Sequence, residues 1–372
     1  MTMNKIKFIF ASALAVAAIS SCLKEEAIVL QEPYTYDEQY FENLREFKKS
    51  KHTISYAYYA AWAPLEGSTG YKDPASFGDR IAGLPDSLDI VNLWMNYPSP
   101  DPKNENYSPI AYADMKYAQE TLGTRFVLHG DASSTRQVVY QGDTINVHEA
   151  YNAWKEGDES QKAVLYKGLD NHVQLMLDKV ADAGLDGVDV DWEPGIPVWH
   201  DHEILTYVMQ KLHDVLKPQG KLTILDVYRS VAPTAVEPLI DYYVVQNYSG
   251  QNGTGWNFNG VWHSCDYLLD RAYTNYVESW GCPIDKMIIC ETAGQHDFNA
   301  NGGALFVEYP SGKQIYSNDG SEMYSFEGFA RWAKRNEAAG WGVFYVGRSY
   351  YATKGPYYDF RRAIQIANPS IR

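Results

Sequence analysis

The chain has 372 residues, of which 45% are hydrophobic and 21% are charged, a composition typical of globular proteins and unlike that of disordered or fibrous chains. Its formal net charge of −15 argues against a surface that follows nucleic-acid phosphates. Four cysteines are too few for a disulfide-built scaffold of this length, whereas 30 Tyr, 13 Phe and 10 Trp call for a use beyond filling one core.

The first 21 residues have the layout of a secretory signal peptide. Lys5 and Lys7 give a positively charged start, and residues 8–18 form an uncharged run that is too short to span a bilayer. The alternative, a buried amino-terminal helix, has neither a cap nor a polar face nearby. The small residues before Cys22 resemble the bacterial lipobox, in which the cysteine becomes the lipid-bearing first residue of the mature protein. We therefore expect lipidation at Cys22; a plain signal peptide with an incidental cysteine is the alternative.

A charged segment, Lys24-Glu25-Glu26, follows this cysteine directly. Such an acidic start resembles the export signal of surface lipoproteins in glycan-degrading Gram-negative bacteria, although a solvated tether has the same character. We expect an outer-membrane lipoprotein, exposed at the cell surface, that meets the membrane through its lipid anchor only. Residues 22–50 would form the tether and a short helix.

Residues 51–372 alternate between short apolar runs and stretches of helical period, without a Pro/Ser-rich linker. Helices are predicted at 164–183, 204–216 and 326–339, and long loops at 98–111 and 298–325. The predicted strands span residues 54–62, 90–95, 125–129, 187–192, 222–228, 243–247, 287–291 and 342–346. Eight strands that alternate with helices favour a single α/β domain, a (β/α)8 TIM barrel. A doubly wound sheet is disfavoured because the first strand lacks a glycine-rich phosphate turn after it.

The segment Leu185 to Pro194, LDGVDVDWEP, carries acids at alternating positions. Strand side chains alternate between faces, so Asp189, Asp191 and Glu193 would point into the barrel and toward its mouth, and the residues between them toward the helices. Burial and like charge both raise carboxyl pKa values, so at least one of the three acids is expected to hold a proton near neutral pH. Glu193 is last in the strand and is the candidate general acid.

Two other uses of an acidic strand fit the sequence less well. A calcium loop would need Gly and Asn or Asp at loop spacing, where this segment has valines. A solvated edge strand would not alternate its acids with Val. In addition, no Cys or His pair has the spacing of zinc ligands on a shared element. We expect neither a metal site nor a cofactor.

Residues 186–193, DGVDVDWE, match the DGxDxDxE signature of glycoside hydrolase family 18, the family of chitinases and endo-β-N-acetylglucosaminidases, whose fold is a (β/α)8 barrel. The resemblance implies that Glu193 protonates the glycosidic oxygen and later activates water, and that Asp191 orients and charge-balances the substrate's 2-acetamido group. Asp189 would share a proton with Asp191, and Asp186 would be structural. The acetamido oxygen would be the nucleophile, giving an oxazolinium ion and net retention.

Gln246 and Tyr248 fall on one face of the sixth predicted strand. This Gln-x-Tyr pattern resembles that of the endo-β-N-acetylglucosaminidase branch, whereas chitinases usually show Met-x-Tyr-Asp at this strand. The resemblance implies that Tyr248 donates a hydrogen bond to the acetamido oxygen and that Gln246 binds the acetamido group or a sugar hydroxyl. Ordinary strand packing is the alternative for this pair. Residues 128–133, LHGDAS, depart from the Ser-x-Gly-Gly pattern of chitinases, which leaves the role of that loop open.

Aromatic residues of the first and last strands are further candidates for sugar binding. Tyr56, Tyr58 and Trp62 share one face of the first predicted strand and could line the barrel mouth. Tyr345 or Tyr350 would form the aromatic floor under the cleaved sugar, because the family's tryptophan is missing from the last strand. Aromatic faces stack on pyranose rings, which gives the high aromatic content a use.

Within the family, the chain most resembles surface-lipoprotein endo-β-N-acetylglucosaminidases of glycan-foraging bacteria, which cut the GlcNAc-β-1,4-GlcNAc bond of N-glycan cores. The expected partner is therefore the N-glycan of a glycoprotein, and no nucleic acid. Two alternatives remain: a glycan-binding lipoprotein that no longer catalyses, and a chitinase. Non-catalytic members usually lose the last Glu of the signature, which Glu193 retains here.

Overall fold

The computed structural model describes residues 36–60, 80–94, 96–250 and 255–369. The chain divides into two compact units, residues 1–40 and 41–372. Of the first unit, residues 36–40 are described, and they include the start of helix α2 (Glu38–Lys49). The predicted signal peptide, Cys22 and Trp62 lie outside the described residues. No helix in the described ranges is long and apolar enough to cross a bilayer.

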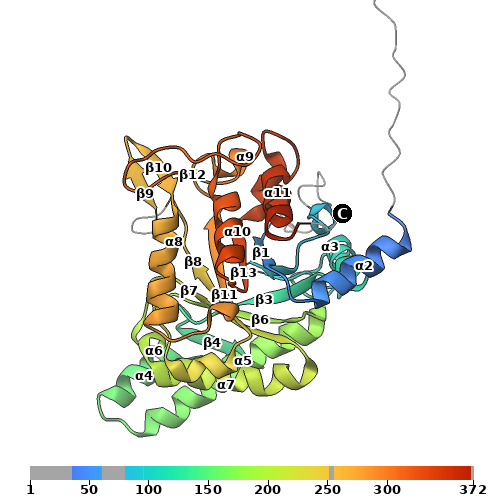
Figure 1. Cartoon of the computed structure of the whole chain (residues 1–372). Helices are drawn as coiled ribbons and strands as arrows, with labels where there is room; N and C mark the ends of the chain where they lie inside the picture. The colour runs from blue at the N-terminus through green and yellow to red at the C-terminus, as the bar shows by residue number, and fades with distance from the viewer. Residues whose placement is uncertain (1–35, 61–79, 95, 251–254, 370–372) are drawn as a thin grey trace, which may run out of the picture. The chain divides into compact units, whose positions relative to one another are not determined.

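Eight parallel strands of the second unit form a closed barrel (Figure 1). Around the barrel the order follows the chain, and pairing between the first and last strands closes it. The strands are β1 (Ile54–Tyr59), β2 (Ile90–Leu93), β3 (Arg125–Asp131), β6 (Gly187–Trp192), β7 (Leu222–Val227), β8 (Tyr242–Gln246), β11 (Met287–Thr292) and β13 (Gly340–Phe344). Each predicted run contains part or all of one of these strands, which confirms the (β/α)8 TIM barrel.

Helices connect the barrel strands (Figure 1). Gly184, with a φ of 64°, caps the end of α5, and the Asp201 side chain accepts from the Glu203 backbone N–H at the start of α7. The helices that follow α2 are α3 (Pro109–Tyr117), α4 (Val147–Lys155), α5 (Ser160–Ala183), α6 (Pro197–His200), α7 (His202–Leu216), α8 (Asp266–Tyr273), α9 (Phe298–Asn301), α10 (Ser325–Arg335) and α11 (Tyr358–Ala367). The three predicted helices correspond to α5, α7 and α10.

Two small sheets are built on the loops that leave the carboxyl ends of barrel strands. β4 (Gln137–Tyr140) and β5 (Asp143–Asn146) form an antiparallel hairpin after β3. β9 (Trp256–Phe258), β10 (Val261–Ser264) and β12 (Leu305–Phe306) form a three-stranded sheet that includes part of the predicted loop 298–325. Barrel enzymes carry their sites at this end of the strands, so both sheets can shape a site there.

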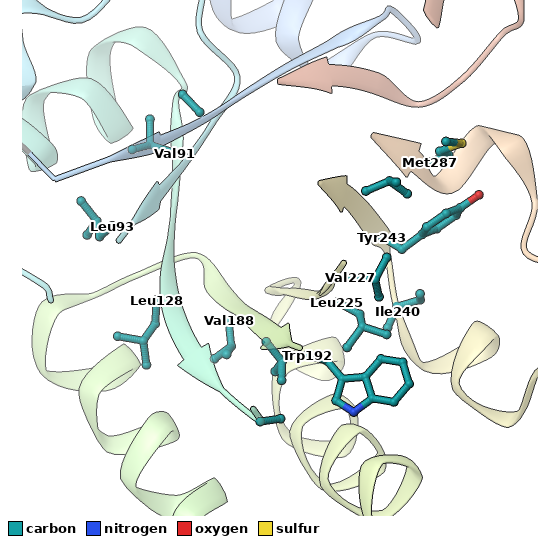
Figure 2. Close-up of a cluster of buried hydrophobic side chains, with 14 of the residues drawn as sticks. Val91, Leu93, Leu128, Val188, Trp192, Leu225, Val227, Ile240, Tyr243 and Met287 are labelled. Carbon is teal, nitrogen blue, oxygen red and sulfur yellow. The ribbon is translucent and has the colours of Figure 1, made fainter. Parts of the chain in front are cut away.

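The core has one layer outside the strands and one inside them. Val188, Val190 and Trp192 of β6 belong to the outer cluster, together with side chains of α5 and α7. Figure 2 shows Val188 and Trp192 of this cluster beside Leu128 and Leu225 from the two neighbouring strands. The inner cluster holds the alternate strand residues, such as Tyr56, Ile224 and Val244. The predicted faces of the acidic strand are therefore confirmed.

Candidate active site

Asp189 lies at the bottom of the site, fully buried inside the barrel. Its Oδ2 accepts hydrogen bonds from the Tyr56 hydroxyl and, at 2.8 Å, from the Asn92 side-chain amide. Its Oδ1 has no hydrogen-bond partner among the described residues. Burial raises the pKa of Asp189 to about 6, although the hydrogen bonds from Tyr56 and Asn92 act in the opposite direction.

A second buried acid, Asp226 of β7, was not predicted. It is paired with Asp191 in the register of β6 and β7. Its Oδ2 accepts hydrogen bonds from the Tyr58 hydroxyl and, at 3.1 Å, from the Gln246 side-chain amide. Burial, reinforced by the charges of Asp191 and Asp189, raises the pKa of Asp226 well above its ordinary value. The alternation of inward-facing Leu222, Ile224 and Asp226 was the available sequence signal.

Asp191 lies between these buried acids and Glu193. The Gln246 amide is 3.5 Å from its Oδ1, and Nε2 of His129 is 3.9 Å from its Oδ2. Burial, then the charges of Glu193, Asp189 and Asp131, raises the pKa of Asp191 to about 8. His129 brings no compensating positive charge, because burial lowers its pKa to about 4. The expectation that one carboxyl of this strand holds a proton near neutral pH is thus met at Asp191.

The loop after β3 holds the backbone on both sides of Glu193, which is half-buried just beyond the end of β6. The Ser133 hydroxyl accepts from the Glu193 backbone N–H at 2.7 Å and donates to the Asp191 carbonyl at 2.9 Å. Two backbone hydrogen bonds also join the loop to the β6 segment, from the Ala132 N–H to the Asp191 carbonyl and from the Gly195 N–H to the Ser133 carbonyl. Sequence reasoning missed Ser133, because nothing in LHGDAS indicates that this loop reaches the next strand.

Asp131 stabilises the same loop at its start. Its carboxylate accepts from the Ser133 backbone N–H at 2.8 Å, from the Ser134 backbone N–H at 3.3 Å and from the Thr135 hydroxyl. Although burial works against the charge, these hydrogen bonds lower the pKa of Asp131. Asp131 is therefore an ionised carboxylate whose oxygens are already occupied.

Phe344 lies at the centre of an aromatic cluster at the end of the last strand. It is the inward-facing residue at the end of β13, and its ring stacks on Tyr248 with centroids 5.4 Å apart and planes 17° apart. Trp94, which follows β2, meets Phe344 edge-on at 5.0 Å. Tyr345 is half-buried beside Trp94 at 4.9 Å, with a left-handed φ of 57° that turns the chain away from the strand. Phe344 and Trp94 were both missed.

Two predicted sugar-binding tyrosines do not line the mouth. Tyr350 packs against the outer hydrophobic cluster and lies 5.7 Å from Tyr357, so its prediction as a floor residue is wrong. Tyr58 is 2% exposed and donates its hydroxyl to Asp226, so it supports that acid below the site rather than offering a face to a sugar. For Tyr58, the face on the strand did not give its depth in the barrel, and Tyr350 lies in a short helix beyond the end of β13.

A cleft of about 580 Å³ contains Asp191 and Glu193. Trp94, His129 and the loop after β3 line it, together with residues of β4 and α5. A larger cavity, of about 660 Å³, lies where the barrel strands begin and has none of the acids of the β6 segment. The smaller cleft is therefore the candidate site. In the described parts of the chain, no three His, Cys, Asp or Glu side chains are grouped so as to hold a metal ion.

The sequence matches the family model of glycoside hydrolase family 18, BT1044-like, over residues 18–366. The chain belongs to this family. A comparison with curated protein sequences gave no match.

Solved structures of this fold show how far the likeness extends. A selenomethionine structure of a Glu-to-Gln variant of BT1044 has 20% identity and a TM-score of 0.62, over 89% of this chain and 93% of that one. An endo-β-N-acetylglucosaminidase from Cordyceps militaris in its apo form has 17% identity and a TM-score of 0.54, over 91% and 98%. The Cordyceps enzyme was also solved as an Asp-to-Asn, Glu-to-Gln double variant with fucosyl-N-acetylglucosamine-Asn, with 16% identity and a TM-score of 0.50, over 90% and 98%. A chitinase from Bacteroides thetaiotaomicron has 14% identity and a TM-score of 0.51, over 85% and 95%. At these identities the likeness establishes the fold.

Proposed function

We propose that this family 18 protein is a retaining endo-β-N-acetylglucosaminidase that hydrolyses the GlcNAc-β-1,4-GlcNAc bond of N-glycan cores. The observation that carries the proposal is the state of the carboxyl groups around Glu193. Asp189 and Asp226 are at most 1% exposed, so neither can attack a sugar. With its pKa raised to about 8, Asp191 is protonated at neutral pH and is a poor nucleophile.

Asp131 is a poor candidate for the enzymic nucleophile because its oxygens accept hydrogen bonds from Ser133, Ser134 and Thr135. A retaining enzyme that uses two carboxylates needs an ionised, accessible second carboxylate about 5 Å from the acid. The described residues offer none, which favours a nucleophile that belongs to the substrate. The 2-acetamido group of N-acetylglucosamine supplies such an oxygen, and attack by this oxygen gives an oxazolinium ion with net retention.

In this mechanism Glu193 protonates the leaving oxygen and then activates water. Asp191 holds the acetamido group, and the positive charge of the oxazolinium ion lowers its pKa as the intermediate forms. Tyr248 donates its hydroxyl to the acetamido oxygen. Burial raises the pKa of Tyr248 well above its ordinary value, so the phenol keeps its proton throughout the working pH range. Gln246 orients Asp191 and binds a sugar oxygen.

The ligand of one solved structure and the residue at position 246 favour an N-glycan over chitin. The fungal variant was solved with fucosyl-N-acetylglucosamine-Asn, and its substituted Asp and Glu are two positions apart, as are Asp191 and Glu193, a spacing that the family's chitinases share. That ligand is the sugar–asparagine core of a glycoprotein. Gln246 is also the first residue of the Gln-x-Tyr pattern, which resembles that of the endo-β-N-acetylglucosaminidase branch. As part of the proposal, a signal ending at lipidated Cys22 would place the enzyme on the outer membrane.

The decisive experiment is Glu193→Gln. The variant should lose at least about 100-fold of its glycan release, because the amide cannot transfer the proton. Release is followed by mass spectrometry on glycoproteins that carry high-mannose, hybrid or complex N-glycans, with chitin oligomers in parallel. Glu203→Gln is the matched control, since Glu203 is exposed on α7, and this variant should keep full turnover.

Three outcomes would contradict the proposal. Full turnover by Glu193→Gln would remove the assigned acid. Binding of N-glycans without cleavage by the unaltered protein would favour the non-catalytic alternative. Cleavage of chitin oligomers, with no release from any glycoprotein, would favour a chitinase.

A further inference from the structure

A second cavity, of about 540 Å³, lies at the carboxyl ends of β7 and β8. Its lining residues follow β7, end β8, or belong to helix α8 and the turn after it. Figure 1 shows α8 beside β8. Gln246 connects this cavity with the candidate active site, because its amide bonds Asp226 inside the barrel and the residue also lines the cavity. Polar side chains line it, among them Arg229, Asn247, Arg271 and Asn275, and Val231 and Ala272 add apolar surface.

Asn247 is the first sign that this cavity binds a ligand. The residue is 7% exposed, and its Nδ2 amide has no hydrogen-bond partner among the described residues. A buried donor without an acceptor costs free energy, and most such groups in folded proteins find a partner. A ligand oxygen in the cavity would supply the missing acceptor.

Arg229 is the second sign. It follows β7 with a φ of 55°, in the left-handed region that a long side chain adopts at an energetic cost. Its guanidinium is exposed and lies 4.8 Å above the ring of Tyr228. This stacking orients the group while leaving its planar set of N–H donors available, the arrangement that recognises a carboxylate through two parallel hydrogen bonds.

The charge of the cavity is opposite to that of the chain. The chain carries −15, yet no Asp or Glu is among the described residues that line this cavity, and two arginines are. Such a local reversal of charge attracts anions. The volume suits a single sugar with its substituents.

We propose that this cavity is a second subsite, which binds the carboxylate of an acidic sugar carried by the glycan substrate. Arg229 holds the carboxylate, and the Asn247 amide donates to a neighbouring sugar oxygen. The apolar side chains contact the ring. The assignment of the ligand to a glycan rests on the proposed function. Sialic acid, the common carboxylate-bearing sugar of complex N-glycans, has the required chemistry.

Three forms of one glycoprotein test this subsite. The first carries sialylated complex N-glycans, the second is desialylated, and the third has its sialic acid carboxylates converted to neutral amides. The unaltered enzyme should show its lowest KM on the first form. Arg229→Ala should raise KM for that form about tenfold, the loss expected for a charge-assisted hydrogen bond, while kcat and both neutral forms stay unchanged.

Two variants separate this role from simple charge. Arg229→Lys keeps the positive charge without the planar donor pair, so its KM should fall between those of the unaltered enzyme and Arg229→Ala. Arg361→Ala removes an exposed arginine of α11, far from this cavity in sequence, and should change nothing. Thermal unfolding checks that every variant is folded.

Equal KM values of the unaltered enzyme on the three forms would overturn the proposal. An equal loss by Arg229→Ala on all three would also overturn it, since it would indicate a structural role. If Arg229→Ala raised KM more for a phosphorylated high-mannose glycan than for the sialylated form, the proposed ligand group would be wrong and a phosphate would take the place of the carboxylate. If the protein releases no N-glycan at all, calorimetric binding of sialyllactose against lactose still tests the cavity. Sialyllactose binding that is lost in Arg229→Ala then supports the subsite, and absence of binding rejects it.

Discussion

Ser133 makes the clearest prediction about a single residue. Its hydroxyl joins the Glu193 backbone N–H to the Asp191 carbonyl, so it fixes the direction from which Glu193 enters the cleft. Ser133→Ala should lower kcat about tenfold to a hundredfold, since small displacements of a catalytic acid are costly, while KM stays within about twofold. Ser133→Thr keeps the hydroxyl and should restore most of kcat.

Steady-state kinetics on one N-glycan substrate measures this split between kcat and KM. Ser311→Ala is the control, because Ser311 is exposed and its hydroxyl bonds the nearby Glu308 carbonyl in the hydrogen bonds described. A rise in KM with unchanged kcat would show that Ser133 binds substrate instead of positioning Glu193.

The sequence predicted site residues where a short, regular pattern carried them. Strand alternation was sufficient to predict that Asp189, Asp191 and Glu193 share one face of the strand, because side chains two residues apart point to the same side. It was insufficient for Tyr58, which shares the inward face but lies too deep to meet a sugar. Depth depends on the closure and stagger of the whole barrel, which no local pattern contains. Alternation was also insufficient for the aromatic floor, since β13 ends at Phe344 and Tyr345 already leaves the strand; Tyr345 as a floor residue stays a prediction.

At the level of elements, Gly187 explains how the acidic strand fits between its neighbours. It begins β6 with a φ of 154°, and a Cβ at this position would lie 2.2 Å from the carbonyl oxygen of Leu222 in β7. The backbone atom cannot move aside without separating the two strands, which hydrogen-bond from Gly187 to Trp192. Gly187→Ala should therefore destabilise the protein by about 3 kcal/mol or more.

Denaturant unfolding followed by circular dichroism measures this loss. Gly220→Ala is the control, because Gly220 also has a positive φ, of 67°, but a Cβ there meets nothing within 4 Å. That substitution should cost only about 1–2 kcal/mol, the backbone strain alone. Equal destabilisation by the two substitutions would show that the close approach of β6 and β7 has no special role.

The barrel strands were predictable as elements because parallel strands buried on both faces give continuous apolar runs. The secondary sheets were not predicted, although the β4–β5 hairpin had a signal. Its turn residues, Gln141 and Gly142, both have positive φ, and Gly after a polar residue favours such turns between β-branched runs. The sheet of β9, β10 and β12 joins segments that are far apart in the chain, so its pairing depends on tertiary contacts.

At the scale of the whole molecule, the active-site acids make stability depend on pH. A buried carboxyl whose pKa is raised binds its proton more tightly in the folded chain than in the unfolded chain. Between the ordinary value of 3.8 and the raised values, about 6 for Asp189 and about 8 for Asp191, the folded state therefore holds more protons. Stability falls with rising pH wherever the folded state holds the extra protons. This contribution is complete below about pH 4 and is lost as pH rises to about 8.

The temperature of unfolding should accordingly fall between pH 5 and pH 8 at constant ionic strength. Asp226→Asn keeps an oxygen for Tyr58 and Gln246 but cannot ionise, so it removes the contribution of a buried carboxyl whose pKa is raised. The variant should therefore unfold at a higher temperature than the unaltered protein at pH 8, with a smaller difference at pH 5. Asp214→Asn, on the exposed side of α7, should leave the slope unchanged. Differential scanning calorimetry from pH 5 to 8 decides the matter: if the curves of Asp226→Asn and the unaltered protein run parallel, the buried acids are not the source of the pH dependence.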